Sequence, residues 1–136
     1  MLFRSVGKIG IPDEVLLKPS HLTTPEMDMM KKHTEIGESI IRPIGSLRHL
    51  CDIIRHHHEK LDGSGYPDGL KGDEISLLVR ITTVADIYDA LTTDRPYRVK
   101  FSFAESHKIL RSMKDQLDQS VVEALIAAFQ EEGQSA

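Results

Sequence analysis

The apolar residues of the N-terminal part of the chain recur at helical spacing. Residues 11–20 hold two prolines around a short apolar stretch, which predicts a single helical turn between loops. Thr23 and Thr24 precede Pro25, and because proline suits the first helical position, a helix is predicted to begin here. The residues predicted to form its buried stripe are Met27, Met30, Ile36 and Ile40.

The middle of the chain predicts two longer helices separated by a turn. The first covers about residues 46–60, and the second covers about residues 76–93. The second is apolar around most of its surface, so it is predicted to be central. Between them, the glycines and the proline of residues 63–72 break any period. The stripe of the first of these helices is Leu47, Leu50, Cys51 and Ile54.

Two more helices are predicted to close the chain. Ser102 and Glu105 match a capping box, which predicts a helix start. A last helix is predicted over residues 121–131, and no strand longer than a few residues is indicated, so the fold class is all-α. The residues expected on one face of the last helix are Val121, Val122, Leu125 and Phe129.

Composition excludes several classes of protein. The chain has 136 residues and a net charge of −4, without a basic stripe, so binding to a DNA or RNA duplex is not expected. No apolar stretch is long enough to span a bilayer. A single cysteine, Cys51, fits a reducing compartment. We therefore expect a cytoplasmic, single-domain protein.

Three histidines are predicted to point inward. His33 lies three residues from both Met30 and Ile36, inside an apolar stripe. His57 and His58 continue the apolar stripe of the helix predicted over residues 46–60. The histidines predicted to lie on a polar face, in loops or at the surface are His56, His21, His49 and His107.

Asp86 is predicted to lie inside the fold on the central helix. Its neighbours Thr82, Thr83 and Ala90 are small and leave room beside the carboxylate. A buried carboxylate protonates or attracts a cation, and an unpaired buried polar group costs about 1–3 kcal/mol. One histidine on an apolar face is more often a hydrogen-bonded core residue, but three with an aspartate favour one or two hydrolytic metals. Asp89 either joins this group or only caps a helix or pairs with an arginine.

Two segments are candidates for ligand contacts. The glycines of residues 62–67 allow close approach of the backbone to a ligand beside Tyr66, although the same residues also suit a tight turn alone. Arg95 and Arg98, on either side of Pro96 and Tyr97, offer planar donors for phosphate oxygens. The same arginines also suit a solvated helix end, so both pairs of alternatives stay open.

From Val6 onward the chain resembles the HD-GYP family, a bacterial branch of the HD metal-dependent phosphohydrolases. The stretches that carry the resemblance, in order, are GKIGIPDEVLLKP, KKHTEIGESII, HHHEKLDGSGYPDGLKGDEISLLVRITTVADIYDALTTDRPYR and SVVEALIAAF. The resemblance implies an HD-domain-like helical bundle that hydrolyses cyclic di-GMP to pGpG and GMP with a metal-activated water. It also implies iron or manganese in a bi- or trinuclear centre.

The resemblance assigns roles to individual residues. Lys8 matches the lysine that closes the HDxGK motif and contacts the scissile phosphate. The metal ligands that the resemblance implies are His33, His57, His58 and Asp86. The positions that it places near the dinucleotide or the metals are Tyr66, Arg95, Arg98 and Asp89.

The chain departs from the family at residues 4–5. Arg4 and Ser5 stand where the family has the His-Asp pair that holds both metals. Because a cation at a ligand position repels a metal, we expect weak or single metal binding and little phosphodiesterase activity. Residues 1–5 are expected to be an artefactual leader. Residues 6–136 would then be the C-terminal major part of an HD-GYP domain that is incomplete at its N-terminus.

Other functions and partners are left open by the sequence. A degenerate HD-GYP protein would bind cyclic dinucleotide or partner proteins without catalysis, and a related phosphohydrolase would act on other cyclic dinucleotides. The family also suggests an upstream sensory or receiver domain. Without the opening helices of the family, the central helix is expected to be partly uncovered, which favours self-association, including a homodimer.

Overall fold

The computed structural model describes residues 3–94 and 99–134, and within these residues it is helical without strands, which confirms the all-α class. The elements in chain order are η1 (Phe3–Gly10), α1 (Asp13–Leu16), α2 (Thr24–Lys31), α3 (His33–Ile41), η2 (Gly45–Leu50), α4 (Cys51–His56), η3 (Gly72–Glu74), α5 (Leu77–Thr92), α6 (Phe103–Ser112) and α7 (Gln119–Gln134). The η elements are 3₁₀ helices. No helix in the described part of the chain is long and apolar enough to cross a membrane.

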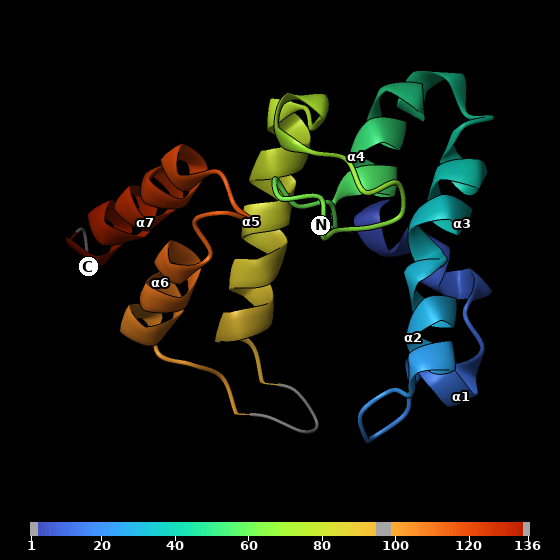
Figure 1. The fold of residues 1–136 in the computed structure, drawn as a ribbon, viewed down its shortest axis with the longest axis horizontal. Helices are drawn as coiled ribbons and strands as arrows, with labels where there is room; N and C mark the ends of the chain where they lie inside the picture. The colour runs from blue at the N-terminus through green and yellow to red at the C-terminus, as the bar shows by residue number, and fades with distance from the viewer. Residues whose placement is uncertain (1–2, 95–98, 135–136) are drawn as a thin grey trace.

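The helices form two groups, with the segment 57–76 between them (Figure 1). In the first group, η1 packs with α3 and α4 around Ile41, Cys51 and Ile54. In the second, α5, α6 and α7 pack together. The buried cluster of the second group is Val84, Tyr88, Leu110, Leu117, Val122 and Ile126. Each group therefore buries a small core of its own.

The helix predicted to continue to Ile40 is two helices, α2 and α3, separated at Lys32. The predicted start is confirmed, because Thr23 and Glu26 form a capping box. The predicted buried stripe is wrong in part, since Met27 and Ile40 are exposed. The residues of α3 that are buried instead are His33, Thr34, Gly37, Glu38 and Ile41.

The close approach of η1 explains which face of α3 is buried. A Cβ atom at Gly7 would overlap the backbone of His33 and Gly37, and one at Gly37 would press on Ile54. The face of α3 that bears Gly37 is therefore the face that packs on η1, while Ile40 is exposed. The predicted boundary of the domain at residue 6 falls inside η1 and stays a prediction.

The helix predicted over residues 46–60 is also interrupted. Its first part is the 3₁₀ helix η2, and α4 ends at His56. The helix stops early because the Glu59 N–H closes a tight turn on the carbonyl oxygen of His56 at 2.8 Å. His57 is the C-cap residue and His58 lies beyond it, so neither of them lies within α4 as the predicted helix required.

The last three helices agree better with the sequence. The Ser102–Glu105 capping box begins α6 as predicted, and α5 begins close to the predicted residue 76, where the Ser76 side chain caps it. On α7, Val122 is buried as expected but Phe129 is 43% exposed. The position buried in its place is Ile126.

Of the histidines expected at the surface, His21 and His49 are exposed, which confirms the prediction. His107 is half-buried on α6, and its ring stacks on Tyr88 with the ring centres 5.9 Å apart, so the surface position predicted for it is wrong. The helical pattern of α6 places His107 towards α5, which the isolated histidine did not reveal.

Candidate metal centre

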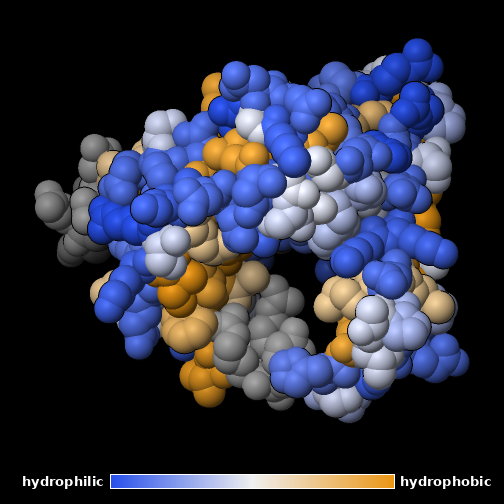
Figure 2. Space-filling model, viewed as in Figure 1, coloured by the Kyte–Doolittle hydropathy of each residue, from blue (hydrophilic) through white to orange (hydrophobic). Residues whose placement is uncertain are grey.

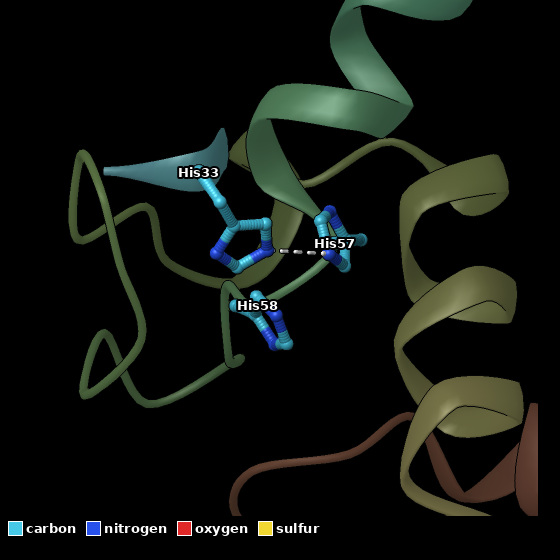
Figure 3. Close-up of side chains that lie close together, drawn as sticks. All are labelled: His33, His57 and His58. Carbon is cyan, nitrogen blue, oxygen red and sulfur yellow. Dashed lines mark hydrogen bonds between the residues drawn. The ribbon is translucent and has the colours of Figure 1, made fainter. Parts of the chain in front are cut away.

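Three imidazoles meet where α3 begins and α4 ends. His33 is the first residue of α3 and His57 caps α4, and both side chains are 2% exposed. His58 follows and is half-buried. One nitrogen atom from each ring lies within 4.8 Å of the others, and Figure 3 shows the three rings turned toward a common space. The prediction that these three histidines converge is confirmed.

The hydrogen bonds of His33 and His57 determine which nitrogen atoms are left to bind a ligand. His33 Nδ1–H donates to the Met30 carbonyl at 2.8 Å, and His57 Nδ1–H donates to the Ile54 carbonyl at 2.9 Å. A carbonyl oxygen can only accept, so in the neutral rings the proton sits on Nδ1 and Nε2 carries a lone pair. The two Nε2 atoms then face each other at 3.4 Å.

Two buried lone pairs at this distance need a cation or a proton between them. Burial lowers the pKa of His33, and the charge of nearby Lys8 lowers it further, both of which oppose protonation. A divalent metal satisfies both nitrogen atoms at once, and backbone carbonyls that orient the rings from behind are the usual outer shell of such a site. The residues therefore fit a metal.

Asp86 lies beside this cluster but does not join its innermost group. Its Oδ2 is 3.8 Å from His58 Nδ1, and its side chain is half-buried on α5. Asp89 is half-buried one turn further along the same helix. Of the four predicted metal ligands, the structure brings the three histidines together and places the carboxylate of Asp86 next to them.

Tyr66 covers one side of the cluster. Its ring stacks on His58 with the centres 4.8 Å apart, and Lys31 Nζ lies 5.6 Å from the centre of the tyrosine ring. Burial raises the pKa of the Tyr66 hydroxyl. Tyr66 is therefore where the prediction placed it, next to the histidines, whereas Arg95 and Arg98 lie outside the described residues.

A model of the HD domain family matches residues 1–121. The chain belongs to this family. The family is metal-dependent, in agreement with the histidine cluster. The relationship to the HD-GYP family that the sequence motifs predicted is confirmed.

Several characterised proteins resemble this HD domain. A cyclic di-GMP phosphodiesterase of Pseudomonas aeruginosa is 38% identical over 93% of the chain. The response regulator RpfG of Xanthomonas campestris, also a cyclic di-GMP phosphodiesterase, is 43% identical over 89% of the chain. A 3'3'-cGAMP-specific phosphodiesterase of Vibrio cholerae is 38% identical over 94% of the chain. The chain spans 31%, 33% and 27% of the length of these three relatives, respectively.

A buried carboxylate that sequence reasoning missed holds the loop of the HD domain that carries Tyr66. Glu59 is 1% exposed, and its Oε1 accepts the N–H groups of Asp68 at 2.7 Å and Gly69 at 3.0 Å. Its Oε2 accepts the N–H of Leu70 at 3.1 Å. The signal was its place directly after the histidine run, where a charged residue in a buried turn needs several donors.

The same loop packs its backbone on the turn that bears His58. A Cβ atom at Gly65 would overlap the backbone of residues 58–60, and Tyr66 N–H donates to the His58 carbonyl at 3.3 Å. Gly63 has a φ of +79°, a conformation that favours glycine. Gly65 therefore allows the backbone of the loop to pack closely on the backbone of residues 58–60, which supports the tight-turn interpretation at this position.

A second set of bonds holds the outer side of the loop. Arg55 donates two hydrogen bonds to Asp68, at 2.7 and 2.8 Å, and a third to Glu38 at 2.8 Å. His56 lies between Asp52 and Asp68. Its Nδ1 is 2.8 Å from the Asp52 carboxylate, and its Nε2 is 2.8 Å from the Asp68 carboxylate. The prediction that His56 is solvated is wrong, because its side chain is 16% exposed and pairs with both acids.

Proposed function

We propose that this HD domain is the metal-binding part of a cytoplasmic phosphodiesterase that hydrolyses cyclic di-GMP to pGpG and GMP. The observation that carries the proposal is the pair of histidine Nε2 atoms facing each other at 3.4 Å beside His58. Iron or manganese is the metal that we propose, held by His33, His57 and His58, with Asp86 next to them. Relatives named as cyclic di-GMP phosphodiesterases support this substrate.

The chain's own residues have defined tasks in this proposal. A bound metal would supply Lewis-acid activation of the phosphate and of the attacking water. Burial lowers the pKa of His33, which favours its neutral ring, and Lys8, whose charge reaches His33, offsets the negative charge that develops on the phosphate. Tyr66 shields the cluster from solvent on one side. Asp89, Arg95 and Arg98 are proposed to contact the dinucleotide.

Arg4 and Ser5 are proposed to limit this activity. They occupy the positions at which the HD-GYP family has its His-Asp pair, so the chain should bind Mn²⁺ weakly and, with Mn²⁺ present, turn over cyclic di-GMP slowly. The double variant Arg4→His/Ser5→Asp should raise both the number of bound Mn²⁺ ions and the rate. An Arg48→His variant, altered at an exposed arginine, is the control.

The measurement is Mn²⁺ titration by calorimetry together with chromatography of the nucleotide products. Fast turnover by the unaltered chain would contradict the limiting role of Arg4 and Ser5. A double variant that binds Mn²⁺ tightly, yet releases neither pGpG nor GMP, would contradict the proposed reaction.

A non-catalytic receptor is the second candidate. The changed His-Asp pair beside the retained Lys8 and Tyr66 favours it. Calorimetry with cyclic di-GMP, with and without Mn²⁺, separates the two, because a receptor binds tightly without metal and without hydrolysis. The relative named as 3'3'-cGAMP-specific makes that dinucleotide a necessary competitor in the same titration.

The response regulator among the relatives supports a further element of the proposal. We propose that the parent protein couples this HD domain to a sensory or receiver domain. Limited proteolysis of the parent protein with and without its input signal would show whether the segment 62–70 changes its protection when the signal arrives.

A further inference from the structure

A pocket of about 290 Å³ lies against the histidine cluster on the side of Tyr66. The residues of its lining that carry polar side chains are Lys31, His58, Lys60, Ser64, Tyr66 and Thr83. His58 belongs both to this lining and to the metal cluster, so the two sites are contiguous. Among the described residues that line the pocket, two are lysines and none is an acid.

The charges of these two lysines are only weakly compensated. Lys60 Nζ donates to the side-chain oxygen of Gln116, a neutral amide, at 3.1 Å. Among the described acids, the charge of Lys60 helps to lower the pKa of Asp62, which is exposed. Lys31 Nζ is 3.5 Å from Asp28, whose side chain is 65% exposed. An ion pair so exposed to water stabilises little and leaves the ammonium group available to a ligand.

The tyrosine ring fixes where the Lys31 ammonium group lies. An ammonium group over the face of an aromatic ring is attracted by the ring electrons, which favours one position for a long side chain. Two ammonium groups that line one pocket repel each other, and an anion between them removes this repulsion. The pocket is therefore suited to a phosphate group and carries donors for it.

We propose that this pocket binds the second phosphate of a cyclic dinucleotide, with Lys31 and Lys60 as the binding residues. The inference rests on the proposed function, in which the phosphate that is hydrolysed lies at the histidines. The volume lies at the lower end of the range typical of pockets for drug-sized ligands, so the pocket suits one part of a dinucleotide. A ligand that reaches past His58 then uses both sites.

The test compares two neighbouring lysines on the same helix end. Lys31→Ala removes a pocket residue, whereas Lys32→Ala removes an exposed lysine that does not line the pocket. Binding of cyclic di-GMP to the Mn²⁺-loaded chain is measured by calorimetry, after a separate Mn²⁺ titration of each variant. Loss of a charge-assisted hydrogen bond predicts a Kd roughly tenfold higher for Lys31→Ala and a Kd nearly unchanged for Lys32→Ala.

Two further measurements sharpen the comparison. Lys31→Arg keeps the charge and should bind nearly as the unaltered chain does. Added NaCl should weaken the binding of cyclic di-GMP to the unaltered chain more steeply than its binding to Lys31→Ala. The reason is that salt screens the attraction between the Lys31 ammonium group and the phosphate, and the variant lacks this contact.

The possible failures are distinguishable. Equal Kd values for Lys31→Ala and Lys32→Ala, with Mn²⁺ binding intact, would overturn the pocket assignment and leave the proposed function standing. If the unaltered chain binds Mn²⁺ but neither cyclic di-GMP nor 3'3'-cGAMP, the proposed function fails and the assignment fails with it.

Discussion

His33 and His57 each use Nδ1 to hold their own ring against a backbone carbonyl, and this places two lone pairs opposite each other. Removing one ring should therefore remove a ligand without removing the turn that carries the other. We predict that His33→Ala lowers the affinity for Mn²⁺ by at least tenfold, since loss even of an outer-shell partner costs 10–100-fold in such sites, as a rough guide. Calorimetric titration of Mn²⁺ measures the change.

His49→Ala is the matched control, because His49 is exposed and belongs to the same group of helices. It should bind Mn²⁺ as the unaltered chain does. Circular dichroism should show that His33→Ala keeps its helices. An affinity equal in both variants would mean that the facing Nε2 atoms do not hold the metal.

Single residues were predictable from the sequence where helical spacing alone decides their direction. His33 was predicted to point inward from its spacing to Met30 and Ile36, and it is buried although the helix is interrupted at Lys32, between Met30 and His33. His56 was not predictable in this way, because its partner Asp68 arrives from a loop twelve residues later. The role of Glu59 also depends on that loop, whose N–H groups turn inward only once the chain has folded back.

At the scale of the elements, the end of α4 and the loop that follows it form one unit. Glu59 is its inner anchor, with both carboxylate oxygens occupied by backbone N–H groups. A glutamine would present an NH₂ group to donors that it cannot satisfy. We predict that Glu59→Gln lowers the free energy of unfolding by about 2–3 kcal/mol, as measured by urea denaturation.

Glu35→Gln provides the comparison, since Glu35 is exposed on α3. It should change the free energy of unfolding by less than about 0.5 kcal/mol. A Glu59→Gln variant as stable as Glu35→Gln would show that the loop is held mainly by its outer contacts.

Asp68 is the outer anchor of the same unit, and its contribution depends on pH. Hydrogen bonds from Arg55 lower the pKa of Asp68 from 3.8 to about 2. Because the folded state has the lower pKa, the stabilisation is complete above the unfolded pKa and is lost as the pH falls from about 4 to about 2. We predict that Asp68→Asn is less stable than the unaltered chain at pH 6 and approaches it near pH 2.

Urea denaturation at several pH values between 2 and 6 measures this convergence. Asp13→Asn, at an exposed position on α1, controls for the loss of one surface charge. If the two stability curves of Asp68→Asn and the unaltered chain run parallel over this range, Asp68 does not anchor the loop through its charge.

The boundaries of the elements were less predictable than their existence. The sequence predicts one helix that runs through Lys32 and another that runs through Leu50, but in the structure each is divided at that residue into two elements. Gly7 and Gly37 bring η1 onto α3, and this contact buries the face of α3 that bears Gly37, while Ile40 stays exposed. Local spacing carries no information about such a contact, so the prediction that Ile40 belongs to the buried stripe was wrong.

The whole molecule has two cores and leaves part of its central helix uncovered. The class and the central position of α5 were predictable, because α5 is apolar around most of its surface. On α5, Leu77, Leu78 and Ile81 are 60%, 61% and 44% exposed, which agrees with the expected uncovered face. Figure 2 shows apolar surface in this group over α6 and the adjoining part of α5.

An apolar groove lies between α5 and α7 in this group. Its volume is about 500 Å³, and Ile81 on one side faces a lining that includes Leu125 and Phe129 on the other. Exposed apolar surface of this kind drives association. We predict that the chain self-associates with rising concentration, and that Ile81→Lys shifts it towards the monomer because a charge in the contact costs desolvation.

Sedimentation velocity over a concentration series measures this shift, and Leu17→Lys is the control. Leu17 is 72% exposed but lies in the other group of helices, next to α1, so a lysine there should leave the association unchanged. If both variants dissociate the chain equally, net charge and not the groove governs association. If the unaltered chain stays monomeric throughout, the groove alone does not hold two copies together, and a homodimer of this HD domain would need contacts elsewhere.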